Sequence, residues 1–117
     1  MTAPAQDQTA PDIAVMRETV SRALALAAPP TAQAVTLLIG QLRGHVELMV
    51  REIEPLAAEQ ADTLSGTLAV TCVGEGRRKL EAGAQVRPAL SSRLAYARRL
   101  ARVLDALCGH HRTLGGR

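Results

Sequence analysis

One apolar stripe in the first half of the chain constrains its fold more than any other feature. Apolar side chains recur along it at steps of three and four residues, which is the period of an amphipathic α-helix. Thr31 precedes the stripe and is of a type that caps helices. Pro55 follows it and lacks a backbone donor, so we expect the helix to kink or restart there and to continue weakly to residue 61. The stripe consists of Val35, Leu38, Ile39, Leu42, Val46, Met49, Val50 and Ile53.

A shorter helical pattern precedes this stripe. Asp12 can cap a first helix that extends to about residue 28, where two consecutive prolines end it. Residues 1–11 are polar, rich in Pro and Ala and without periodicity, so we expect them to form a disordered tail. We expect residues 12–114 to form a single helical domain, because a chain of 117 residues suffices for one modest core.

A third helix is expected over about residues 67–81, after a connection at residues 62–66. Gly74 and Gly76 lie inside it. Because each glycine costs about 1 kcal/mol relative to alanine in a helix interior, they indicate either a close helix crossing or a weak helix. The apolar face consists of Ala69, Cys72, Val73, Gly76 and Leu80.

The fourth helix should open at Pro88, with Gly83 capping the helix before it. Its end lies at Gly109 or at the glycine pair of residues 115–116. The apolar seam is wide enough that a second copy of the chain could bury part of it, so a homodimer is an open alternative. No alternating strand pattern is present, so the predicted fold class is all-α, a small bundle of about four helices. The seam consists of Leu90, Leu94, Ala97, Ala101, Leu104, Cys108 and His111, widened by Leu100, Val103 and Leu107.

Charge is distributed unevenly along the chain. Residues 1–62 carry four basic and eight acidic side chains, whereas residues 63–117 carry ten basic and three acidic ones. The basic half can face nucleic acid or an acidic partner, or it can lie against the acidic half of the same molecule, which is the interpretation we favour. One Tyr and no Phe or Trp leave almost no aromatic platform for stacking single-stranded nucleic acid.

Neither a membrane span nor a secretion signal is evident. No segment approaches the roughly 18 to 20 apolar residues that a membrane span needs. Residues 1–12 lack the positive start and apolar run of a secretion signal. We therefore expect a cytoplasmic protein that does not bind membranes.

The sequence contains no recognisable catalytic, cofactor or metal motif. His110 and His111 are adjacent and point about 100° apart, so they cannot chelate as a simple pair. Cys108 and His111 are three residues apart, which leaves open a metal site completed by Cys72 or His45. The better interpretation is that both cysteines fill apolar positions, whereas a reactive thiolate needs an open, electropositive setting. We expect no enzymatic activity and no cofactor.

Three stretches are distinctive when they occur together in this order. They are LRGHVELMVREIEPLA from Leu42, CVGEGRRKLEAG from Cys72 and LAYARRLARVLDALCGHHRTL from Leu94. Over residues 13–114 the chain resembles a family of short actinobacterial helical proteins of unknown function, usually labelled natural product biosynthesis proteins. Arg51 stands where the family pattern has a proline, and Pro55 follows four residues later. The motif positions are Arg43, Gly44, His45, Glu47, Glu75, Arg77, Arg78, Cys108 and His110.

We interpret these motif positions as a polar network between helices, for example Glu75 with an arginine or with His45, in preference to a ligand site. The arginines of the fourth helix add a basic set, since they fall on the side opposite its seam. With Arg77, Arg78 and Lys79 they can form an exposed patch that binds phosphate. The candidate interaction or polar-network residues are Arg43, His45, Glu47, Glu75, Arg77, Arg78, Arg98, Arg99 and Arg102.

Two functions follow as hypotheses. The first is a non-catalytic helical accessory or interaction protein with an unidentified protein partner, associated with natural product biosynthesis. The second is a nucleic-acid-associated transcriptional regulator that uses the basic third and fourth helices, although no short helix-turn-helix is legible. Retention on a DNA column that depends on salt would separate them.

Overall fold

The computed structural model describes residues 10–25 and 30–116. Within them the chain forms four α-helices and no strand, so the predicted all-α bundle is confirmed. The first nine residues of the predicted tail lie outside the described residues. The elements are α2 (Ile13–Leu24), α3 (Ala32–Glu59), α4 (Leu64–Ala82), the short 3-10 helix η1 (Gly83–Gln85) and α5 (Leu90–Thr113).

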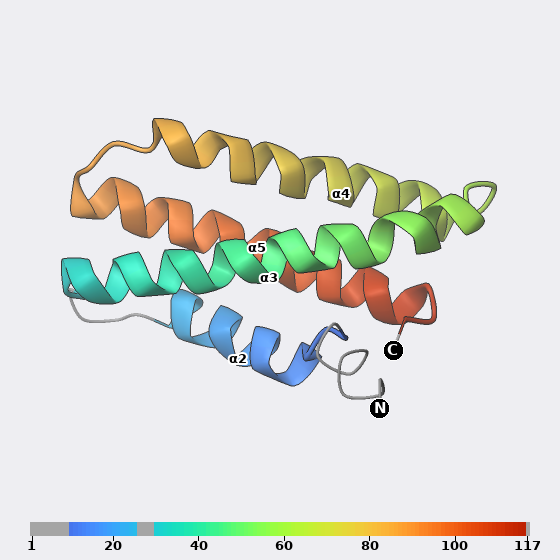
Figure 1. Ribbon diagram of the computed structural model, residues 1–117, viewed down its shortest axis with the longest axis horizontal. Coiled ribbons are helices and arrows are strands. Elements are labelled where there is room, and N and C mark those ends of the chain that lie inside the picture. Colours follow the sequence, from blue (N-terminus) through green and yellow to red (C-terminus); the bar gives the residue numbers. More distant parts are fainter. Residues whose placement is uncertain (1–9, 26–29, 117) are drawn as a thin grey trace, which may run out of the picture.

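The pair α3 and α5 forms the centre of the bundle. Each of these two helices packs against the other and against both remaining helices. In Figure 1, α4 lies on one side of the pair and α2 on the other. Leu42 of α3 and Leu100 and Leu104 of α5 are completely buried, so the core lies along this pair. The seam of α5, whose width left a homodimer open, is covered by helices of the same chain.

Side-chain caps start three of the helices. The Asp12 carboxylate accepts a hydrogen bond from the backbone N–H of Val15 (3.1 Å). The Thr31 hydroxyl accepts one from Ala34 (3.0 Å). These caps satisfy backbone donors that a helix start leaves unpaired, and both predicted caps are confirmed. The end predicted for the first helix, near residue 28, falls on residues 26–29, outside the described residues, and the helix itself ends at Leu24.

The start of α4 differs from the prediction. Thr63 caps this helix through a hydrogen bond from the Gly66 N–H (3.0 Å), so the connection is shorter than residues 62–66 and the helix begins three residues before Thr67. Gly66 is a helical residue rather than a linker glycine. A Cβ atom there would collide with the backbone carbonyl of Gln60, and only glycine permits this close approach.

Pro55 does not end or restart the second predicted helix. The helix α3 is continuous from Ala32 to Glu59 with Pro55 inside it, so it ends before residue 61 as well. Proline removes one hydrogen bond from the helix. Ile53 and Ala57 are completely buried on either side of it, so packing stabilises both turns despite that loss.

Gly76 marks a close helix crossing, as one of the two alternatives predicted. A Cβ atom at this position would lie 3.1 Å from Cγ2 of Val50 and 3.6 Å from Cδ1 of Leu107, so α4 approaches both central helices here. Gly83 caps α4 as predicted. Pro88 does not open the last helix, because α5 begins at Leu90 with Ala89 as its cap. Proline there ends the connection before the helix rather than supplying its first turn.

Replacing Gly66 with alanine should destabilise the fold. The new methyl group would meet backbone atoms, which cannot move away as a flexible side chain can, and such overpacking costs about 1 to 3 kcal/mol. Gly40 provides the matched control, since nothing lies within 4 Å of a Cβ atom built there. Gly40→Ala should stabilise by about 0.5 to 1 kcal/mol through helix propensity alone. Urea unfolding followed by circular dichroism measures both, and equal effects would contradict the assigned crowding.

Candidate functional site

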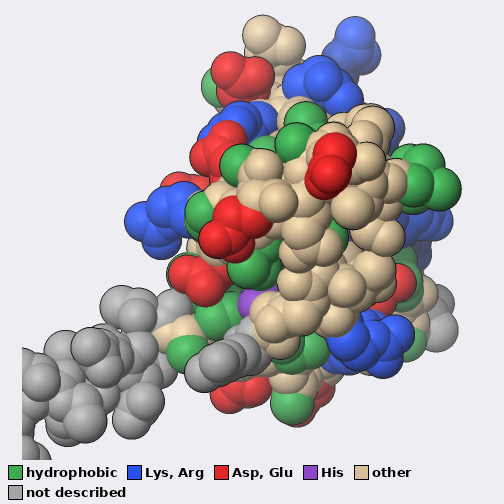
Figure 2. Space-filling model, turned by 90° about the vertical axis from the view of Figure 1, so that its right-hand side faces the viewer, with side chains coloured by type: hydrophobic (Ala, Val, Ile, Leu, Met, Phe, Trp, Pro, Cys, Tyr) green, Lys and Arg blue, Asp and Glu red, His purple; other side chains and the backbone are tan. Residues whose placement is uncertain are grey.

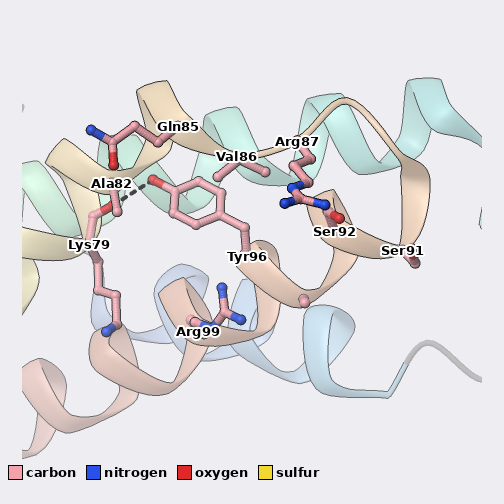
Figure 3. A pocket seen from close by; sticks show the side chains of 10 residues that line it. Lys79, Ala82, Gln85, Val86, Arg87, Ser91, Ser92, Tyr96 and Arg99 are labelled. Carbon is pink, nitrogen blue, oxygen red and sulfur yellow. Dashed lines mark hydrogen bonds between the residues drawn. The ribbon is translucent and has the colours of Figure 1, made fainter.

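A buried polar cluster joins three helices at one end of the bundle. Arg43 of α3 donates to the Tyr96 hydroxyl of α5 (2.6 Å) and to the backbone carbonyl of Leu80 in α4 (2.8 Å). The Tyr96 hydroxyl in turn donates to the backbone carbonyl of Lys79 (2.7 Å), the dashed line in Figure 3. Carbonyls in the last turn of a helix have no partner within it. The cluster therefore satisfies the end of α4 with side chains from the two central helices.

The cluster also explains the glycine that follows α4. A Cβ atom at Gly83 would collide with the Arg43 guanidinium and lie 2.7 Å from the Tyr96 hydroxyl. Tyr96 is 3% exposed, and its hydroxyl both accepts and donates a hydrogen bond. Arg43 therefore belongs to a polar network between helices, in which it bonds Tyr96 and the Leu80 carbonyl rather than Glu75 or His45. We had not counted Tyr96 among the candidate residues, although a lone aromatic beside an apolar seam was a signal.

His45 and Glu47 lie elsewhere on α3. His45 is half-buried and close to α2, where burial and the positive charge of Arg22 lower its pKa, partly opposed by Asp12. Its imidazole is therefore favoured in the neutral form. Glu47 is exposed. Neither residue contributes to the Arg43 cluster.

The candidates on α4 point in different directions. Arg77 makes two contacts with Glu54 of α3 (2.7 and 2.8 Å), and this pairing lowers the pKa of the Glu54 carboxyl and raises that of Arg77. This pair joins the basic second half of the chain to the acidic first half, which is the interpretation that we favoured. Arg78 pairs only with Glu75 one turn away (3.1 Å), and both side chains are solvent-exposed, so this pair is weak.

The three candidate arginines of α5 also lie in different surroundings. Arg99 and Arg102 are exposed, and no hydrogen bond or ion pair reaches either one from the part of the chain that the structure describes. Arg98 is half-buried and already has a partner. It lies two turns from Asp105, which pairs with Arg17 of α2 (3.2 Å), so Arg98 belongs to the flank facing α2. Of the basic set that could form one exposed patch, Arg77 is thus paired with Glu54 and Arg98 is half-buried.

A groove runs between α4 and α5, and Arg78, Lys79, Arg99 and Arg102 line it. Its volume is about 600 Å³. Both its apolar and its basic side chains come from the two helices. We call it the α4–α5 groove, and it is lined by Leu68, Thr71, Cys72, Glu75, Arg78 and Lys79 of α4 and by Arg99, Arg102, Val103, Ala106 and His110 of α5.

The groove continues into a second hollow beside Tyr96. Lys79 and Arg99 line both spaces, and Figure 3 shows them entering from opposite helices, with Arg87 toward the start of α5. The end of the bundle at the right of Figure 1 carries charges of both signs, and Figure 2 shows acidic and basic side chains around its rim. Lys79 belonged to the predicted basic set, whereas the apolar lining of the groove was not predicted.

The two cysteines lie in covered positions. Cys108 is buried and Cys72 is half-buried, and burial raises the pKa of both thiols. Both are therefore protonated near neutral pH. His111 is also buried. In the described residues, no three His, Cys, Asp or Glu side chains come close enough to hold a metal ion.

The fold and the groove define this molecule as a small all-α bundle with a basic, partly apolar groove along one side. The chain belongs to the family described as "Family of unknown function (DUF6415)", whose model matches residues 14–116. Comparison with curated proteins and with solved structures gives no match. In the described residues, no helix combines the length and apolarity that crossing a membrane requires.

Removing the tyrosine hydroxyl should loosen the end of α4. Tyr96→Phe removes the donor to the partly buried Lys79 carbonyl, which should cost about 0.5 to 1.5 kcal/mol of unfolding free energy. A double-mutant cycle with Arg43→Met isolates the contact between the two side chains. We expect a coupling energy above about 0.5 kcal/mol in urea unfolding, as is typical for residues of one hydrogen-bond network. Additive effects would show that the two side chains act independently.

The stability of the protein should depend on the titration of His45. Its folded-state pKa lies below the ordinary 6.5, so between these two values the unfolded chain binds more protons. This contribution is complete above pH 6.5 and is lost as the pH falls through the folded-state pKa. Unfolding curves between pH 8 and 5 should show this decline for the native protein and a smaller one for His45→Gln. Arg22→Gln should also reduce it, since Arg22 is the second cause of the lowered pKa. Parallel pH profiles would contradict the assignment.

Proposed function

We propose that this protein is a non-catalytic helical accessory protein that works by binding a protein partner. One observation carries the proposal, namely the α4–α5 groove, which combines exposed apolar side chains with basic ones. Of the latter, Lys79, Arg99 and Arg102 have no ion-pair partner among the described residues. Leu68 at the groove is 50% exposed and the neighbouring Leu64 is 75% exposed. An apolar surface beside fixed charges is typical of interaction sites.

The state of the ionisable groups supports a role without catalysis. A nucleophilic cysteine requires a lowered pKa, whereas the thiols of Cys72 and Cys108 have raised ones. Glu54 has a lowered pKa, which makes it a poor proton donor near neutral pH. We therefore assign the polar candidates to packing and recognition.

The cellular setting is proposed from the resemblance. The three motif stretches resemble proteins labelled for natural product biosynthesis in actinobacteria, and we place the protein in the cytoplasm of such an organism. Lys79 is the only lysine, and a preference for arginine suits a GC-rich genome. In this setting the protein would assist or regulate an enzyme of specialised metabolism.

A nucleic-acid-associated regulator is the second candidate. The observation that favours it is the convergence of Arg78, Lys79, Arg99 and Arg102 on one groove, since clustered cations bind phosphates. Two features favour a protein partner instead. The groove has an apolar floor that phosphates would not cover, and Arg77 is already paired with Glu54.

An affinity pull-down from the lysate of the native host tests the proposal. The tagged protein is used at low and moderate salt, with and without nuclease, and captured proteins are identified by mass spectrometry. We expect a protein partner that survives nuclease treatment. Recovery of nucleic acid that is lost with added salt, and lost again in an Arg99→Glu/Arg102→Glu variant, would replace the proposal with the regulator. An Arg51→Glu/Arg112→Glu variant has the same net charge and serves as the control.

A further inference from the structure

We infer that the α4–α5 groove binds an acidic amphipathic helix of about three turns, contributed by the partner protein. This inference rests on the proposed function and names the chemistry of the partner. It is carried by three properties of the groove, which are its apolar floor, its uncompensated positive charge and its length.

The apolar floor lies toward the start of α4. Leu68 and Cys72 of α4 face Val103 and Ala106 of α5 across the groove. Leu68 is half exposed, and Ala106 is exposed as well, so apolar area remains for a partner to cover. Burial of such area stabilises a complex by about 25 cal/mol per Å² before the costs of association. A ligand must therefore present apolar side chains at this end.

Positive charge lies toward the other end of the groove. Four cationic side chains, Arg78, Lys79, Arg99 and Arg102, accompany a single carboxylate, Glu75. Among the described residues, Arg78 is the one ion-pair partner of Glu75. The other cations have no ion-pair partner within the described ranges, so a ligand with carboxylates at this end would supply the missing counter-charge.

The groove matches a helix in length and direction. From Leu68 to Lys79 along α4 there are eleven residue steps of about 1.5 Å, which gives about 16 Å, or three helical turns. Acidic residues stabilise the N-terminal turn of a helix. The docked helix should therefore place its N-terminal turns at the cations and its apolar residues at the floor, antiparallel to α4. This is the helix-in-groove mode of recognition.

Other occupants match only part of the groove. A second copy of this chain docked face to face would place the cations of one groove against the cations or the apolar floor of the other, and neither arrangement supplies counter-charge. Nucleic acid would pair with the cations and leave the apolar floor against phosphates and water. Only a ligand that is acidic at one end and apolar at the other satisfies both halves.

Selection from a peptide library tests the inference. The probe is a phage-displayed library of 16-residue peptides whose positions vary among Ala, Leu, Glu, Gln and Lys, all good helix formers. Selection on the full-length protein should enrich Glu in the first two turns and Leu at steps of three and four residues thereafter, and should deplete Lys. A lack of enrichment, or enrichment of neutral or basic peptides, would overturn the inference.

Titration of the enriched peptide then locates its binding site. Fluorescence anisotropy should show about tenfold or greater weakening for Arg99→Glu/Arg102→Glu and for Leu68→Gln. The controls, Arg51→Glu/Arg112→Glu and Leu37→Gln, change exposed residues outside the groove and should leave the affinity within about twofold. All of these positions are solvent-exposed, and circular dichroism checks that each variant folds. Equal binding by groove and control variants would also overturn the inference.

The failure of this inference is distinguishable from that of the proposed function. If the pull-down yields a protein partner that binds the two groove variants normally, the accessory role stands and the groove assignment is wrong. If nucleic acid is captured instead and the library yields no peptide, both fail.

Discussion

The contact between α3 and α5 is the interaction on which the rest of the structure depends. These two helices carry the longest apolar stripes, and their side chains provide most of the fully buried residues, among them Leu42, Ile53, Leu100 and Leu104. An isolated helix of either kind would expose that surface to water, and helices gain most of their stability from burying it. The remaining helices pack against this pair from opposite sides, α2 on one and α4 on the other (Figure 1).

The position of α4 on this pair explains the groove. Gly76 lets α4 approach Val50 of α3 and Leu107 of α5 closely, while Arg43 and Tyr96 bind the carbonyls at its end. With α4 held at these points, its flank around Leu68 and Cys72 faces α5 without being covered by it. The groove is therefore a consequence of how the core is packed.

The position of α4 also determines which of its basic side chains are paired with acidic ones. Arg77 and Arg78 are neighbours in sequence, yet consecutive residues on a helix point about 100° apart. Arg77 reaches the acidic helix α3 and pairs with Glu54, whereas Arg78 faces the groove. The unequal charge of the two halves of the chain is thus partly neutralised inside the molecule. Lys79, Arg99 and Arg102, which have no ion-pair partner among the described residues, lie between α4 and α5.

The sequence alone determined the elements of this protein, and only the tertiary structure decided its surfaces. Helical periods and the caps Asp12 and Thr31 are local, so the all-α class and two helix starts were predictable. Gly66 was misread because a close backbone approach outweighs its local preference. Of the two outcomes predicted at Pro55, a kink or a restart, the restart is wrong, because the buried turns on either side keep the helix continuous. Tyr96 bonding with Arg43, 53 positions away, and Arg99 lying opposite Lys79 depend on how helices distant in sequence pack together. No local pattern encodes such pairings, because they arise only when the shared core is buried.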